Sequence, residues 1–137
     1  MHFEYQIYEA DFVNAGAASS AVKKTLKQLN ISPQVIKRVV VALYEAEVNA
    51  IAHAYGGTIY ADIEPDHITM KVVDTGPGIP DIDWAMQEGN STASPEVRDM
   101  GFGAGMGLPN IKKNVDKLNV TSKVGVGTSV EMEVDFV

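Results

Sequence analysis

The sequence predicts an α+β fold in two layers, in which helices cover one face of a mixed, mostly antiparallel β-sheet. Two observations predict it. Segments of alternating hydrophobicity lie near both ends and in the middle of the chain, and two helical segments are grouped between the first and the second of them. The chain has 137 residues, 45% of them hydrophobic, which is enough to bury one core. We therefore expect a single domain over residues 1–137.

The composition excludes several classes of function. A formal net charge of −7 argues against a nucleic-acid partner, because the phosphate backbone favours clustered Lys and Arg. The absence of cysteine excludes disulfides, thiolate metal sites and a cysteine nucleophile. The N-terminus lacks the pattern of a signal peptide, and no segment approaches the ~18 apolar residues of a membrane span. We therefore expect a cytoplasmic protein with no membrane partner.

The N-terminal part of the chain predicts one strand and two helices. Residues 3–8 are aromatic-rich and alternate, as in a strand. Asp11 is a suitable N-cap for a helix that runs to about residue 29. A second helix begins at Ser32-Pro33, since Pro suits the first helical position, and runs to about residue 55, where Gly56-Gly57 ends it.

The remaining regular segments predict two pairs of strands with a helix between them. Residues 58–64 and 67–74 are rich in β-branched side chains and predict a hairpin that turns at Pro65-Asp66. Residues 108–118 predict a third helix. The tail predicts strands over 120–123 and 128–136, with a glycine-containing turn between them.

A row of polar side chains interrupts the apolar second helix. Glu45, Asn49 and His53 follow one another at i, i+4 spacing, so they share a face. One interpretation is a solvated stripe with ordinary hydrogen bonds. The other is a functional pair, in which a carboxylate transfers a proton beside an amide that binds a cation or a phosphate oxygen. Glu47 lies off this face, and we expect it to be structural.

Two glycine-rich segments are also candidate binding elements. A predicted strand is followed by the segment Asp74-Thr75-Gly76-Pro77-Gly78. The Asp74 carboxylate could accept a hydrogen bond from an exocyclic amine of a flat ligand that the glycines allow to approach. The equal alternative is that the segment forms only a tight turn. Alternating glycines from Gly101 to Gly107 lead into a helix, which predicts an anion-binding loop, with a flexible linker as the alternative. The lysine of a Walker loop and the strand of a dinucleotide motif are both missing.

Together and in this order, the three elements resemble the GHKL family of ATP-binding domains. Residues 45–55 resemble the N-box of bacterial anti-sigma-factor serine kinases, while 74–78 and 103–107 match the two glycine boxes. Residues 78–92 and 103–109 are closest to the stressosome-type switch kinases. The resemblance implies the Bergerat ATP-binding fold with a flexible lid at about 82–106. Residues 93–100 depart from the family pattern as an insertion in that lid.

The resemblance implies a role for each candidate residue. Glu45 is the general base for a substrate hydroxyl, Asn49 ligates Mg²⁺ with the phosphates of ATP, and Asp74 accepts from the adenine amine. His53 either contacts phosphate or caps the pocket as a structural residue, and Arg98 is a weaker candidate for the γ-phosphate. The remaining positions shape the adenine pocket or line the lid: Gly76, Gly78, Thr128, Gly103, Gly105 and Gly107.

The implied function is that of an ATP-dependent protein serine/threonine kinase. It would phosphorylate a STAS-domain antagonist and exchange it for a sigma factor or another regulator. One alternative is a non-catalytic, ATP-gated binding module, and another is a histidine-kinase-type catalytic domain that acts in trans. Glu45 favours the serine/threonine kinase, because a pure binder needs no carboxylate there and an imidazole needs little help from a base. A homodimer is left open by the sequence.

Overall fold

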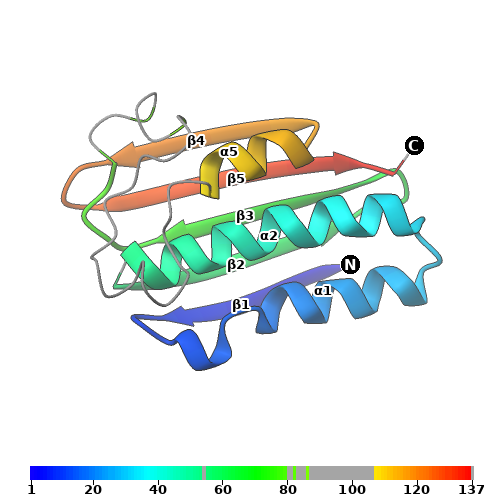
Figure 1. Ribbon diagram of the computed structural model, residues 1–137, viewed down its shortest axis with the longest axis horizontal. Coiled ribbons are helices and arrows are strands. Elements are labelled where there is room, and N and C mark those ends of the chain that lie inside the picture. The colour runs from blue at the N-terminus through cyan, green and yellow to red at the C-terminus, as the bar shows by residue number, and fades with distance from the viewer. Residues whose placement is uncertain (54, 80–81, 83–85, 87–106, 137) are drawn as a thin grey trace.

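The computed structural model describes residues 1–53, 55–79, 82, 86 and 107–136. In this part of the chain, one five-stranded sheet is covered on one face by helices (Figure 1). The strand order is β1-β2-β3-β5-β4, and each pairing between neighbours is antiparallel. The predicted α+β class and the two layers are confirmed. The expected mixed, mostly antiparallel sheet is corrected in one respect, because all four described pairings are antiparallel.

Period-2 alternation places one side of every strand against the helices. The strands are β1 (His2–Tyr8), β2 (Gly56–Ile63), β3 (His67–Asp74), β4 (Lys117–Lys123) and β5 (Gly127–Asp135). In the central pair, Met70 lies opposite Met132, and both are buried. The predicted hairpin of β2 and β3 is confirmed.

The first helix begins later than the predicted Asp11. Residues Phe12–Asn14 form only a 3₁₀ turn, and α1 spans Ala17–Gln28. The carboxylate of Asp11 accepts from the Asn14 side chain at 3.0 Å instead of capping a helix. Gly16 separates the turn from α1 with a φ of 93°, which glycine adopts readily.

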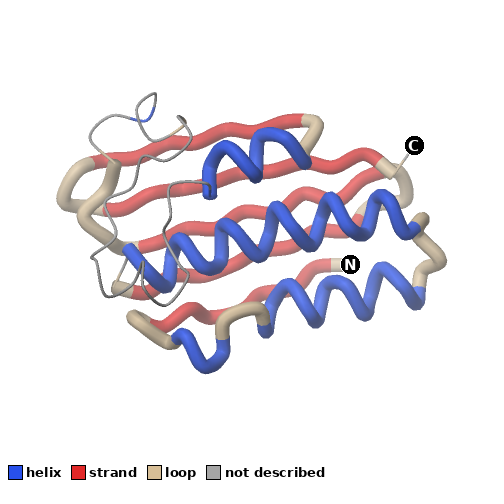
Figure 2. The backbone as a smooth tube through the Cα atoms, in the orientation of Figure 1, coloured by secondary structure: helices blue, strands red, loops and turns tan. Residues whose placement is uncertain are grey.

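The second helix, α2 (Pro33–His53), crosses the middle of the sheet (Figure 2). Its start is as predicted: the Ser32 hydroxyl accepts from the Val35 N–H at 3.4 Å. Its end comes before the predicted residue 55, because the N–H of Tyr55 donates to the Thr75 carbonyl. Within the described residues, no helix is long and apolar enough to span a membrane.

The helix predicted over residues 108–118 corresponds to α5 (Gly107–Asn114), which ends earlier. The last residues of the predicted helix pair with the sheet instead. The N–H of Asp116 donates to the Glu133 carbonyl, and β4 begins at Lys117. Arg38 fixes this junction to α2. Its guanidinium donates to the Asn114 carbonyl at 3.1 Å and to the Asp116 carboxylate at 3.0 Å.

Candidate functional site

The last turns of α2 present the predicted pair of polar side chains. Glu45 and Asn49 are half-buried and lie one turn apart on the same face. The Asn49 side chain makes no hydrogen bond with any residue that the structure describes. Its amide is therefore available to a ligand. His53 is the last residue of α2, and its side chain is not among the described features.

Glu45 has a partner that the sequence did not reveal. The side-chain amide of Asn110, on α5, donates to Glu45 Oε1 at 3.3 Å. This bond orients one oxygen of the carboxylate and leaves Oε2 without a hydrogen bond among the described residues. The two residues are 65 positions apart, so no spacing rule applied to the sequence could have paired them.

The structural role expected of Glu47 is confirmed. Its side chain is 4% exposed and accepts from three backbone N–H groups, those of Gly16, Ala18 and Ser19, at 3.2–3.3 Å. The Ser19 hydroxyl donates to the same carboxylate at 3.2 Å. A carboxylate at a helix N-terminus also interacts favourably with the helix dipole. Glu47 therefore acts as the cap of α1, supplied from α2.

Asp74 ends β3 with a half-buried carboxylate. Its Oδ1 accepts from the Thr128 N–H at 3.0 Å, and its Oδ2 makes no hydrogen bond among the described residues. Burial raises the pKa of Asp74, and the hydrogen bond from Thr128 opposes that shift. The residue thus keeps one acceptor oxygen for a donor that arrives with a ligand.

Thr128 takes part in a network centred on Ser122. Thr128 is only 8% exposed, and its hydroxyl lies 2.9 Å from the Ser122 hydroxyl. Ser122 donates to the Gly127 carbonyl at 3.1 Å, so its oxygen accepts from the Thr128 hydroxyl and from the Ile79 N–H at 2.7 Å. Ser122 was not among the predicted site residues. It lies opposite Thr128 in the β4–β5 pairing, and only the structure gives that register.

Two glycines hold the loop after Asp74 against the β4–β5 turn. A Cβ on Gly78 would lie 2.6 Å from the Lys123 carbonyl oxygen, and one on Gly127 would lie 2.0 Å from the Asp74 carbonyl oxygen. Both residues also have positive φ, at 79° and 150°. A side chain at Gly127 would therefore force Asp74 away from β5, and one at Gly78 would force its loop away from Lys123. Gly76 is buried in the same loop.

The fold brings these residues to one end of the molecule. The C-terminal end of α2, the end of β3 and the β4–β5 turn lie at the same edge (Figure 1). Hydrogen bonds from Tyr55 to Thr75 and from Thr75 to Gly56 join the segment after α2 to the segment after β3. Gly107 begins α5. Arg98, Gly103, Gly105 and most of the predicted lid lie outside the described residues.

The sequence matches the histidine kinase-like ATPase domain family over residues 8–134. The chain belongs to this family. An anti-sigma F factor from Caldanaerobacter subterraneus subsp. tengcongensis is 36% identical over 124 residues, which are 87% of this chain and 83% of that protein. The serine/threonine-protein kinase RsbT of Bacillus subtilis is 30% identical over 119 residues, 84% of each chain. These matches confirm the resemblance on which the site assignments depend.

A solved structure has the same fold. It contains the RsbU and RsbW domains of a Mycobacterium tuberculosis protein, with a TM-score of 0.67 and 15% sequence identity. The match covers 98% of this chain, which spans about a third, 32%, of that longer one. At this identity the likeness shows the fold alone. Membership of an ATPase family makes ATP the expected ligand of the site.

Proposed function

We propose that this protein is an ATP-dependent protein serine/threonine kinase that phosphorylates a STAS-domain antagonist and exchanges it for a sigma factor or a similar regulator. The observation that carries the proposal is the pair on α2, where a half-buried carboxylate, Glu45, lies one turn from the available amide of Asn49. The kinase and anti-sigma names of the relatives support it. We further propose that residues 1–137 form one cytoplasmic domain with a lid at about 82–106.

The adenine end of the site consists of Asp74 and the residues that hold it. Asp74 Oδ2 would accept from the exocyclic amine of adenine, while Oδ1 stays bonded to the Thr128 N–H. The Ser122–Thr128 network fixes that N–H, and Gly78 and Gly127 permit the close packing. Gly76 leaves room for a flat ring, since it has no side chain. Guanine would present a carbonyl where this carboxylate needs a donor.

The phosphate end fits a magnesium ion held mainly by the nucleotide. Among the described residues, no group of three or more His, Asp or Glu side chains gathers to hold a metal ion. On this face of α2, the amide oxygen of Asn49 has no hydrogen-bond partner among the described residues and could serve as an oxygen ligand. Mg²⁺ is commonly bound through one or two protein groups, with phosphate and water completing its shell. When bound, the ion would neutralise phosphate charge. His53, Arg98, Gly103, Gly105 and Gly107 are proposed as further contacts to the phosphates.

Glu45 provides the proton chemistry in this proposal. As the oxygen of the substrate serine forms its bond to the γ-phosphorus, the bond from that phosphorus to the bridging oxygen of ADP breaks. The hydroxyl proton passes to Glu45 Oε2, while Asn110 holds Oε1. Phosphoryl transfer depends mainly on positioning and charge neutralisation, so a single carboxylate is a sufficient base. Asn110 is a positioning residue, since it acts through Glu45.

A transfer assay tests the proposal directly. The protein is incubated with Mg-ATP and a purified STAS-domain protein to which it binds, and phosphoserine is identified by mass spectrometry. We expect one phosphate on a serine of the STAS protein. Stable binding without transfer would replace the kinase with an ATP-gated binding module. Transfer to a histidine of a separate protein would favour a histidine-kinase-type domain.

A further inference from the structure

The basic residues of this chain are concentrated in one segment. Residues 12–44 contain five Lys and Arg residues and no Asp or Glu, so they carry a charge of +5. The remainder holds all eighteen acidic residues and six basic ones, and carries −12. The segment comprises the 3₁₀ turn Phe12–Asn14, α1, the loop after α1 and about half of α2. An acidic protein thus has one strongly basic region, and that region lies on the helical layer.

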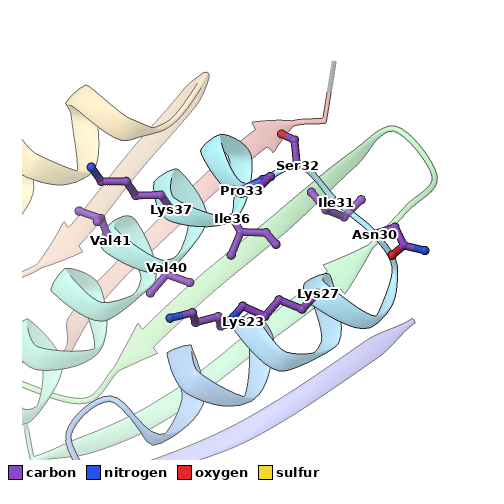
Figure 3. Close-up of a pocket in the computed structure, with 10 residues that line it drawn as sticks. All are labelled: Lys23, Lys27, Asn30, Ile31, Ser32, Pro33, Ile36, Lys37, Val40 and Val41. Atoms are coloured by element: carbon purple, nitrogen blue, oxygen red, sulfur yellow. The ribbon is translucent and has the colours of Figure 1, made fainter.

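A groove of about 530 Å³ lies within this segment, between α1 and α2. Ile36 and Val40 point from α2 towards α1, and Ile31 closes the end near the loop (Figure 3). Ile36 is buried, while Ile31, Val40 and Val41 are half-buried. The groove therefore has an apolar floor that water reaches in part.

Three lysines border the groove. Lys23 and Lys27 extend from α1, and Lys37 lies on α2 (Figure 3). All three are exposed, and none makes an ion pair or a hydrogen bond with a residue that the structure describes. Arg38, in contrast, is already paired with Asp116. The three ammonium groups are therefore available to negative groups on a partner.

We infer that this groove binds an acidic amphipathic segment of a partner protein, with apolar side chains on Ile36 and Val40 and carboxylates on Lys23, Lys27 and Lys37. A helix that places apolar residues in a groove and charges at its edges is a common mode of peptide recognition. Charge complementarity favours a short segment. A long polyanion such as nucleic acid, or an anionic membrane, would extend over the rest of the protein, whose charge of −12 would repel it.

The groove is separate from the proposed phosphotransfer site. Ile36 and Asn49 lie thirteen residues apart on one helix, which corresponds to about 20 Å along its axis. A segment bound in the groove would leave Glu45, Asn49 and Asp74 open to ATP and substrate. The inference needs neither ATP binding nor phosphotransfer, so it can fail while the kinase proposal stands, and the reverse.

The test uses a fluorescein-labelled, helix-forming peptide with Leu at positions i, i+3, i+4 and i+7 and Glu at most others. The variant Lys23→Gln/Lys27→Gln/Lys37→Gln removes the border charges. The matched control, Lys24→Gln/Lys71→Gln/Lys112→Gln, removes the same charge from exposed lysines that do not line the groove. Anisotropy gives the Kd of each protein, and hydrogen exchange maps the bound region.

We expect the groove variant to weaken peptide binding by about tenfold or more and the control to change it by about twofold at most. Protection from exchange should fall within residues 23–41, and a peptide with Ser in place of Leu should bind poorly. Both variants should keep the wild-type affinity for ATP. Equal weakening by the two variants, no binding, or protection elsewhere would overturn the inference. It would also be overturned if single-stranded DNA or phosphatidylserine vesicles bound the groove as tightly as the peptide.

Discussion

The Asp74 carboxylate accepts one hydrogen bond, from the Thr128 N–H, and burial raises its pKa. In the ligand-free protein, this carboxylate is therefore only partly compensated for its loss of water. Asn49 likewise presents an amide without a described partner. Glu47, by contrast, has four donors. Of these three residues, Glu47 is fully satisfied and structural, whereas Asp74 and Asn49 keep capacity for a ligand.

Asp74→Asn should weaken ATP binding by about 1–3 kcal/mol, because the variant must choose between two hydrogen bonds. If its amide oxygen accepts from the Thr128 N–H, its NH₂ group meets the adenine amine donor to donor. Titration calorimetry with ATP and GTP measures the effect. Wild-type protein should prefer ATP strongly. Equal wild-type affinity for ATP and GTP would contradict the role of Asp74.

The same substitution should change how stability depends on pH. Because the folded-state pKa of Asp74 is raised above its usual 3.8, the folded state binds the proton more tightly than the unfolded state. Stability contributed by this group therefore falls as pH rises through the window from 3.8 to the raised value, and stays lower above it. Asp74→Asn removes this dependence. In urea unfolding of nucleotide-free protein, the free energy of unfolding of the variant should rise relative to that of wild type as pH increases across that window. A fall in this difference would contradict the assignment.

Asn49→Ala should remove the dependence of nucleotide affinity on Mg²⁺, because the ion takes few ligands from the protein and cannot easily replace one. Affinity for ATP in EDTA should change much less. Titrations of wild type and variant with and without the ion measure both effects. The assignment of Asn49 fails if the variant keeps the full wild-type response to Mg²⁺.

Element boundaries show where sequence patterns were sufficient. The alternation of apolar and polar residues that predicted the strands corresponds to alternating burial in the structure. The start of α2 at Ser32-Pro33 was predicted from local capping chemistry. The start of α1 could not be predicted locally, because its cap is Glu47, which lies 28–31 residues away. The end of α5 depends on pairing with β5, which is also not adjacent in the sequence. Local signals predicted the elements, and long-range partners set two of their ends.

Glu47→Ala should destabilise the fold by about 2–4 kcal/mol, because it leaves the buried N–H groups at the start of α1 without an acceptor. Chemical unfolding followed by circular dichroism measures the loss. Glu131→Ala is the control, since Glu131 is exposed on β5 and should change stability by about 0.5 kcal/mol at most. Similar losses in both variants would mean that Glu47 is not the cap.

At the scale of the molecule, α2 connects two regions of different character. Its C-terminal end carries Glu45 and Asn49 beside the end of β3, and its N-terminal half borders the basic groove. The order of the sheet, with β5 between β3 and β4, has no local signature in the sequence. Only the family resemblance could predict that Glu45, Asp74 and Thr128 share one site, because these residues are far apart in the chain. Asn110 and Ser122 needed the structure.

In the proposed mechanism, Glu45 accepts the proton of the substrate serine. Glu45→Gln keeps the size of the side chain and an oxygen for the Asn110 amide, but removes its basicity. Single-turnover transfer from Mg-ATP to a bound STAS protein should slow by ~10²–10⁴-fold, while ATP affinity stays within a few-fold of wild type. Transfer by Glu45→Gln at the wild-type rate would show that Glu45 is not the general base.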